Sequence, residues 1–263
     1  MLNYMNKQPI GIFDSGVGGT SIWKAIHALL SKENTIYLAD SANAPYGPKG
    51  KEAILALSEK NTEYLLNQNC KLIVVACNTA TTNAISYLRQ KYDVPFIGIE
   101  PAIKPAALQT KTKAIGVLAT RGTLTSQLFC DTAQLYSNGI KIIEQEGEGI
   151  VQLIESGHID SDQMTMLLKT YLKPMLAANI DYLVLGCTHY PYLIRQLLSL
   201  LPSHVKIIDS GEAVAKQTKA VLEQHNLLNL SDSKSVLQFY SNGNPLVMES
   251  LLGDPYKVDY LKF

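Results

Sequence analysis

Two cysteines in this 263-residue chain occupy the same kind of position, at the end of a short apolar run. Residues 74–76 lead to Cys77, and residues 184–186 lead to Cys187. Such runs predict buried strands, and in α/β proteins the carboxyl ends of strands open into binding clefts. The polar residues that follow predict a helix start, where backbone N–H groups and the helix dipole favour a thiolate. We therefore interpret Cys77 and Cys187 as a functional pair rather than as buried apolar side chains.

Three kinds of chemistry are open to a site built on these thiols. The first is a reactive thiolate. The second is zinc, because Cys77, Cys187 and His189 could supply three ligands, although the chain has neither Cys-x-x-Cys nor His-x-x-x-His spacing. The third is a redox disulfide between the two cysteines. The other cysteines, Cys70 and Cys130, lie in or beside helical patterns, and we expect both to be small buried hydrophobic residues.

A glycine-rich segment, residues 14–21, is the second candidate site. Loops of this kind before a helix often hold anions on backbone N–H groups. The segment lacks the glycine at position 21 that a dinucleotide fingerprint needs, and it lacks the Gly-Lys-Ser/Thr ending of a P-loop. We therefore expect a smaller anion such as an amino-acid carboxylate, with Asp14 orienting an ammonium group or a proton. The alternative is that Asp14 and Ser15 only cap the helix.

Other polar residues carry weaker signals. Residues 40–48 have the composition of a Pro/Gly turn, and we expect them to be no more than that on the sequence pattern alone. Glu155 stands alone on a helical pattern and is expected to be solvated. His189 lies two residues after Cys187 and is a better candidate to act with the thiol. Trp23 is expected to pack in the core.

The elements that must position these residues alternate between strand and helix. Strand-like runs begin near residues 10, 35, 72, 96, 114, 140, 182 and 205. The intervals between starts are 25, 37 and 24 residues in the first half and 26, 42 and 23 in the second, so one pattern is used twice. Helical patterns between the runs include single segments over 17–30 and 123–136. We predict an α/β fold of two similar lobes, each a mainly parallel sheet flanked by helices, related by a pseudo-twofold with the active site between them.

The domain division follows from this repeat. Residues after 209 have no counterpart in the second copy and carry two further strand-like runs, over 237–240 and 258–261. We expect this tail to fold back onto the first lobe. The predicted division is therefore a discontinuous first lobe, residues 1–98 plus 210–263, and a second lobe of residues 99–209.

Composition excludes several classes of protein. Lys plus Arg and Asp plus Glu both total 23, so nothing favours nucleic acid or an anionic membrane as a partner. Residues 1–9 lack the apolar core of a secretory signal, and no apolar run is long enough to span a bilayer. Four cysteines without close pairs fit reduced thiols. We expect a cytoplasmic protein.

Taken together, these segments resemble the glutamate racemase family, whose members are cofactor-independent amino-acid racemases. The resemblance extends over nearly the whole chain. Its characteristic blocks, in order, are residues 11–19, Asp40 with 45–47, 76–80 and 185–191. Residues 239–243 also resemble the closing strand of the family. The Cys-Pro pair that the family often has ahead of the residue matching Glu155 is missing here.

This resemblance implies interconversion of L- and D-glutamate without cofactor or metal, supplying D-glutamate for peptidoglycan synthesis. It implies that Cys187 deprotonates L-glutamate and Cys77 deprotonates D-glutamate, with Asp14, Glu155 and His189 as auxiliary catalytic residues. The substrate contacts that it implies are Asp14, Ser15, Tyr46, Gly47, Asn78, Thr79, Thr120, Thr188 and His189. A homodimer is also a family expectation.

The two-lobed repeat suits this chemistry. Racemisation removes the Cα proton from one face and returns a proton to the other, which needs one acid/base group on each side of the substrate. Two alternatives remain at this point. One is a racemase of aspartate or of another acidic amino acid on the same fold, and the other is a two-lobed amino-acid binding protein without catalysis.

Overall fold

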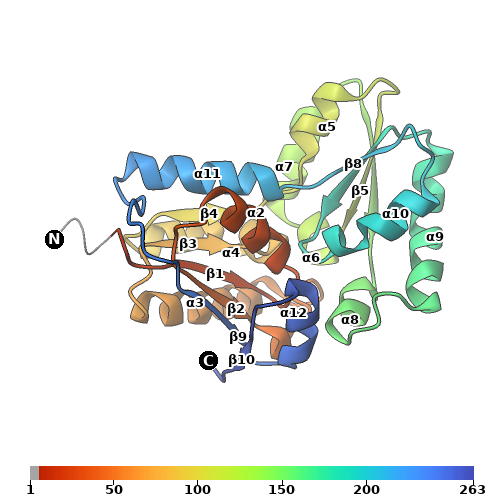
Figure 1. Cartoon of the computed structure of the whole chain (residues 1–263). Coiled ribbons are helices and arrows are strands. Elements are labelled where there is room, and N and C mark those ends of the chain that lie inside the picture. The colour runs from red at the N-terminus through yellow and green to blue at the C-terminus, as the bar shows by residue number, and fades with distance from the viewer. Residues whose placement is uncertain (1–5) are drawn as a thin grey trace.

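The chain folds into two lobes, each built around its own β-sheet, in a computed structural model that describes residues 6–263 (Figure 1). The strands of the first lobe are β1 (Ile10–Asp14), β2 (Thr35–Ala39), β3 (Leu72–Val75), β4 (Phe96–Gly98), β9 (Leu237–Ser241) and β10 (Asp259–Tyr260). Those of the second are β5 (Ala114–Ala119), β6 (Lys141–Glu146), β7 (Tyr182–Gly186) and β8 (Lys206–Ile208). The strand pairs described in both sheets are parallel, which confirms the predicted α/β class.

The sheet orders show the repeat directly. The first sheet runs β10-β9-β2-β1-β3-β4 and the second runs β6-β5-β7-β8. The order β2-β1-β3-β4 therefore recurs as β6-β5-β7-β8, with each strand replaced by the one four places later. Strand β3 is equivalent to β7, and Cys77 and Cys187 follow these two strands.

Alternating side chains bury both faces of the first sheet. On β1, Ile10 and Ile12 pack with Trp23 on one face, while Phe13 packs on the other. Helices α2 (Thr20–Leu29) and α11 (Gly211–Gln224) cover the first face, and α3 (Lys51–Asn67) and α4 (Asn78–Lys91) cover the second (Figure 1). Strands buried on both faces are apolar throughout, which is why the sequence showed them so clearly. Trp23 lies in the core, as expected.

The second lobe has the same layered build. Helices α5 (Ile103–Gln109) and α7 (Gln127–Tyr136) pack on one face of its sheet. Helices α8 (Ile150–Glu155), α9 (Asp162–Ala177) and α10 (Ile194–Leu200) pack on the other, and a 3₁₀ turn, η2 (Tyr190–Leu193), precedes α10.

Two predictions fail in the α6–α7 region. The single helix expected over 123–136 is divided into α6 (Arg121–Leu124) and α7. The division occurs because the Ser126 hydroxyl accepts a hydrogen bond from the Phe129 N–H (3.3 Å) and so caps a new helix. Cys130, expected to be buried, is exposed, because the residues that α7 buries are Phe129 and Ala133.

The C-terminal tail joins the first sheet. Strand β9 pairs with β2, and α12 (Pro245–Leu252) packs against α2. The chain passes between the lobes twice, once between β4 and α5 and once between β8 and α11 (Figure 1). The exact domain boundaries at 98/99 and 209/210 stay a prediction.

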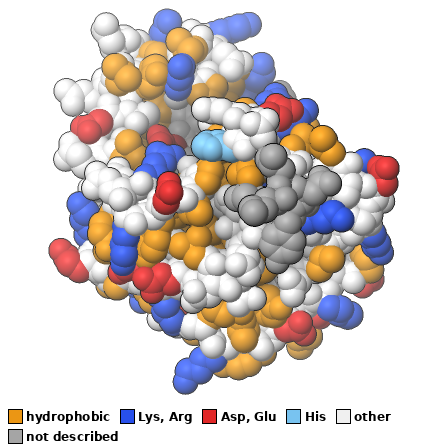
Figure 2. Space-filling view, turned by 90° about the vertical axis from the view of Figure 1, so that its left-hand side faces the viewer, with side chains coloured by type: hydrophobic (Ala, Val, Ile, Leu, Met, Phe, Trp, Pro, Cys, Tyr) orange, Lys and Arg blue, Asp and Glu red, His pale blue; other side chains and the backbone are white. Residues whose placement is uncertain are grey.

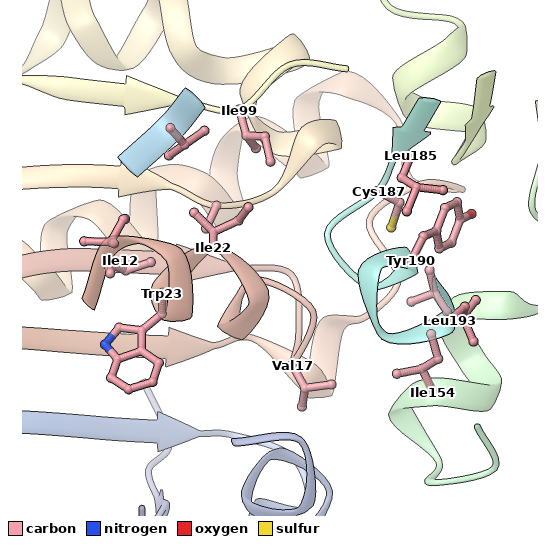
Figure 3. Close-up of a cluster of buried hydrophobic side chains, with 14 of the residues drawn as sticks. Ile12, Val17, Ile22, Trp23, Ile99, Ile154, Leu185, Cys187, Tyr190 and Leu193 are labelled. Atoms are coloured by element: carbon pink, nitrogen blue, oxygen red, sulfur yellow. The ribbon is translucent and has the colours of Figure 1, made fainter. Parts of the chain in front are cut away.

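Apolar packing continues from one lobe to the other. Val17, on the loop after β1, belongs to the same cluster of buried side chains as Ile154 on α8 and Leu193 on η2. Figure 3 shows Val17 on the side of the first lobe that faces these second-lobe residues. The lobes are therefore held together by buried hydrophobic contact as well as by the polar contacts of the site.

The outer surface shows no dominance of one charge on the face drawn in Figure 2. Basic and acidic side chains are interspersed there, and hydrophobic side chains form separate groups among them. Between residues 6 and 263, none of the helices combines the length and the hydropathy needed to cross a bilayer.

Candidate active site

The two cysteines predicted to act together face one cavity between the lobes. Cys77 is 4% exposed and Cys187 is 7% exposed. The cavity has a volume of about 10 Å³, which is room for about one water molecule. Its lining consists of Ser15, Pro45, Tyr46, Gly47, Cys77, Asn78, Thr79, Thr120, Val151, Cys187, Thr188 and His189. Almost every residue that the resemblance assigned to substrate is in this lining.

Two predicted residues, Asp14 and Glu155, do not line the cavity themselves but contact residues that do. The Asp14 carboxylate accepts a hydrogen bond from the Thr188 hydroxyl at 3.0 Å. The Glu155 carboxylate lies 2.6 Å from His189 Nε2. The expectation that Glu155 is merely solvated is therefore wrong, because the packing of α8 between the lobes leaves its side chain only 13% exposed.

An imidazole lies beside the Cys187 thiol. His189 Nδ1 is 3.7 Å from Cys187 Sγ, and its other ring nitrogen contacts Glu155. Burial lowers the pKa of His189, but the hydrogen bonds with Cys187 and Glu155 outweigh burial and raise the pKa well above its usual value. A raised pKa favours the protonated imidazole, which can donate towards both neighbours. In proteins generally, a cationic neighbour at hydrogen-bond distance activates a cysteine.

Within the described residues 6–263, no cationic side chain affects the Cys77 thiol in this way. It precedes α4, where its sulfur accepts a hydrogen bond from the Ala80 N–H (3.4 Å), and it lies 3.5 Å from the Ser15 hydroxyl. Burial and the charge of Asp14 raise the pKa of Cys77 well above that of a free cysteine, and these hydrogen bonds offset the rise only in part. Cys77 is therefore a neutral thiol at neutral pH.

Three N–H groups of the glycine-rich loop are bonded to carboxylates of the protein itself. Asp14 accepts from the N–H groups of Ser15 (2.6 Å) and Gly19 (2.5 Å), and Glu155 accepts from that of Val17 (2.7 Å). The prediction that this loop holds a substrate anion on its N–H groups is therefore wrong for these three donors. Asp14 is fully buried, and burial raises its pKa despite the nearby His189 cation.

Two glycines of this loop make room for the second lobe. A Cβ at Gly16 would overlap the Glu155 carboxylate, and a Cβ at Gly18 would overlap the His189 ring. The glycine-rich sequence therefore serves the docking of one lobe onto the other. The helix expected to begin at residue 17 begins at Thr20 because residues 15–19 form this docking loop.

The segment over residues 40–48 is more than a surface turn. Tyr46 is buried in the cavity wall and donates to Asp40 at 2.5 Å. It also accepts from the Asn61 amide at 3.2 Å. Burial and the Asp40 charge raise the pKa of Tyr46, so its hydroxyl stays neutral. The turn prediction failed because the partner Asn61 comes from a separate helix.

Three threonine hydroxyls meet across the two lobes at one side of the cavity. Thr79 lies 2.8 Å from Thr120 and 3.3 Å from Thr123, and Thr120 lies 3.1 Å from Thr123. Beside them, within residues 6–263, neither polar atom of the buried Asn78 amide has a hydrogen-bond partner. Sequence reasoning missed Thr123, although its spacing of three from Thr120 across a helix start was a usable signal. It also missed the cavity-lining Val151.

The zinc hypothesis finds no ligand set in the part of the chain that the structure describes, where no three His, Cys, Asp or Glu side chains are grouped to hold a metal ion. Cys70 is buried, as expected, and burial raises its pKa to about 12.

Comparison with known proteins identifies the class. Residues 10–218 match the family model described as Asp/Glu/Hydantoin racemase. The chain belongs to this racemase family. It is 44% identical over 241 residues to a glutamate racemase of Herpetosiphon aurantiacus, covering 92% of this chain and 95% of that protein.

Solved structures give the same result. A glutamate racemase of Francisella tularensis in complex with D-glutamate superposes with a TM-score of 0.84 at 29% identity, covering 98% of both chains. A glutamate racemase of Escherichia coli in complex with L-glutamate and the activator UDP-MurNAc-Ala superposes with a TM-score of 0.83 at 34% identity, covering 96% of this chain and 97% of that one. The prediction of an amino-acid racemase of this family is confirmed.

Proposed function

We propose that this racemase interconverts L- and D-glutamate by exchanging protons between Cα and two cysteines, Cys187 and Cys77, on opposite faces of the substrate. The relatives named above support glutamate as the substrate. The single observation that carries the mechanism is the difference between the two thiols. One lies beside the His189 imidazole and the other beside the buried Asp14 carboxyl group, so the first is suited to act as a base and the second as an acid on the same cavity.

The proton steps follow from this difference. With L-glutamate bound, the Cys187 thiolate takes the Cα proton and becomes a thiol. The Cys77 thiol then gives its proton to the opposite face of the carbanion, which yields D-glutamate and leaves a thiolate at Cys77. The reverse direction starts from the Cys77 thiolate. His189 keeps its proton in both half-reactions and stabilises negative charge on Cys187.

Substrate groups fit the polar walls of the cavity. The threonine hydroxyls and the Asn78 amide can donate hydrogen bonds to a carboxylate. The partial positive charge at the N-terminus of α4 also stabilises an anion there. Thr188 lines the cavity, and its hydroxyl, which donates to the Asp14 carboxylate behind the wall, is placed to accept from the substrate ammonium. Donors that are fixed before the reaction stabilise the carbanion because they need no reorganisation as charge develops.

The cavity between the thiols is by itself too small for glutamate, although a second cavity of about 100 Å³ shares Gly47, Thr120 and Val151 of its wall. A space of about 10 Å³ holds a water molecule rather than an amino acid. Contacts across the lobes, such as those between Thr79 and Thr120, must lengthen when the substrate is bound. Lobe motion of this kind occurs on microsecond to millisecond timescales and often limits turnover.

The experiment that tests this function uses both enantiomers of glutamate in deuterated water. We expect each enantiomer to give the racemic mixture, with deuterium at Cα of the inverted product. Binding of glutamate without inversion or Cα exchange would identify a binding protein instead. Equal turnover of aspartate would favour a broader acidic amino-acid racemase.

A role in the cell follows from this activity. We propose that the enzyme acts in the cytoplasm and supplies D-glutamate for peptidoglycan synthesis, as the resemblance to glutamate racemases implies. Depletion of the protein should arrest wall synthesis, and added D-glutamate should restore growth. Failure of D-glutamate to restore growth would contradict the role. A homodimer stays a prediction, which sedimentation of the purified protein would test.

A further inference from the structure

We propose that Ser41 of the first lobe is a positioning residue for the Cys187 half of the reaction. Its hydroxyl holds Glu155 of the second lobe beneath His189, so that the charge on the imidazole depends on closure of the two lobes. This inference rests on the proposed racemisation, in which the His189 cation supports the Cys187 thiolate.

The contacts of Glu155 carry the proposal. Its Oε1 accepts from the Val17 N–H (2.7 Å) and from His189 (2.6 Å), and its Oε2 accepts from the Ser41 hydroxyl (2.8 Å). Two of these three donors belong to the first lobe, although Glu155 itself is on α8 of the second. The carboxylate also lies against Gly16, where any side chain would overlap it. The first lobe therefore forms a complementary binding site for the Glu155 carboxylate, made by Ser41, Val17 and Gly16.

Ser41 is itself held in place by the segment after β9. Asn242 accepts from the Ala42 N–H (2.8 Å) and donates to the Asp40 carboxylate (2.5 Å), so it holds the residues on both sides of Ser41. A Cβ at Gly243 would come within 2.6 Å of the Ser41 Cβ, so the glycine allows the two segments to meet. This gives a function to the family-like residues 239–243, which touch neither thiol.

The position of the Glu155 carboxylate affects the reaction through the charge on His189. The hydrogen bond with Glu155 and the charge of its carboxylate are among the causes that raise the pKa of His189, so the position of this carboxylate affects the charge on the imidazole. The other ionisable groups that interact with this pair are Cys187, Asp14 and the more distant Tyr37. Parting of the lobes removes the Ser41 and Val17 donors together, so the imidazolium is best supported in the closed enzyme.

The first experiment is a titration of His189 by nuclear magnetic resonance in wild type, Ser41→Ala and Gly243→Ala, with a His189→Gln sample to assign its signal among the five histidines. We expect the pKa of His189 to fall by on the order of one unit in both variants, because Glu155 loses a donor. The alkaline limb of the pH profile of kcat/KM should move to lower pH by a similar amount.

The matched control is Ser21→Ala. Ser21 donates to the Thr188 carbonyl oxygen across the same interface at 2.9 Å and does not touch Glu155. We expect this variant to leave the pKa of His189 at its wild-type value. An unchanged His189 pKa in Ser41→Ala, or an equal shift in Ser21→Ala, would overturn the proposal.

The results of these titrations do not depend on whether the proposed function is correct. The titration reports on His189 whether or not the enzyme racemises glutamate. Thermal unfolding of each variant checks that the fold is intact, and Gly243→Ala keeps the Ser41 hydroxyl but displaces it. A shifted His189 pKa in an enzyme that shows no Cα exchange would support the positioning of Glu155 and contradict racemisation alone.

Discussion

The two halves of the site are equivalent in topology and opposite in electrostatics. Cys77 and Cys187 follow the third strand of equivalent sheets, and both face one cavity. Cys187 lies beside the buried His189 imidazole, whose other ring nitrogen contacts Glu155. Around Cys77, burial and the charge of Asp14 favour a thiol. In the proposed mechanism, the repeated fold supplies two acid/base groups at facing positions, and the differences between the copies decide which one begins as the base.

This difference has a thermodynamic limit. Enantiomers have equal free energies in water, so kcat/KM must be the same in both directions whatever the side chains around the thiols. The asymmetry of the site can therefore appear only in kcat and KM separately, in isotope exchange, and in variants that remove one half.

The largest effect is expected from removing either thiol. Cys77→Ser and Cys187→Ser should each lower the racemisation rate by about 10²- to 10⁴-fold, because the hydroxyl is a far weaker acid and base at the same position. Circular dichroism of the glutamate product measures this rate. Near-normal turnover in either variant would contradict a mechanism with two thiols.

A smaller effect, confined to one half, is expected from Glu155→Gln. The amide keeps the shape of the side chain but cannot stabilise the imidazolium, so the pKa of His189 should fall by about one to two units. We expect kcat/KM near neutral pH to fall by about 10- to 100-fold, with the alkaline limb of the pH profile moved to lower pH. A uniform loss at all pH values would point to a packing defect instead.

A smaller effect still is expected at the threonine cluster. Thr123→Val removes one hydroxyl of three without changing the shape of the side chain. If the cluster holds a substrate carboxylate, KM for glutamate should rise by about 10-fold while kcat stays within about 2-fold of wild type. Ser126→Ala, at the start of α7, is a control for local disturbance of the helix. An unchanged KM in Thr123→Val would remove this hydroxyl from the substrate site.

The smallest expected effect is on stability. The pKa of Cys77 is raised on folding, so the folded state retains a proton that the unfolded state loses above pH about 8.5. The free energy of unfolding should therefore fall as the pH rises above that value, and it should fall less steeply in Cys77→Ser.

His189 acts in the same direction. Its raised pKa stabilises the fold fully below about pH 6.5, and this contribution is lost as the pH rises through its folded pKa. Urea unfolding at several pH values measures both slopes.

Sequence patterns predicted the parts of this molecule that depend on neighbours along the chain. Strands β2 and β7 have the predicted bounds because each is an apolar run closed by a turn residue. The repeat predicted that Cys77 and Cys187 occupy equivalent positions, and the family resemblance added the residues around them.

Long-range contacts were beyond the sequence pattern. Ser41 and Glu155 are 114 residues apart, and the residues next to each of them in the sequence do not predict their contact. The glycines at positions 16 and 18 predicted an anion site, since the sequence could not show that the second lobe would fill the space above them. The break before α7 depended on whether Ser126 would cap a helix or continue one.

The most direct test of the asymmetry follows Cα exchange in deuterated water in two variants, each with one of the two site cysteines replaced. Cys77→Ser retains Cys187, the proposed base for L-glutamate, and should exchange the Cα proton of L-glutamate but not of D-glutamate. Cys187→Ser should exchange only D-glutamate, and more slowly, because Cys77 is a neutral thiol at neutral pH. Exchange of both enantiomers by one variant, or faster exchange in Cys187→Ser than in Cys77→Ser, would contradict the assignment of base and acid to the two halves.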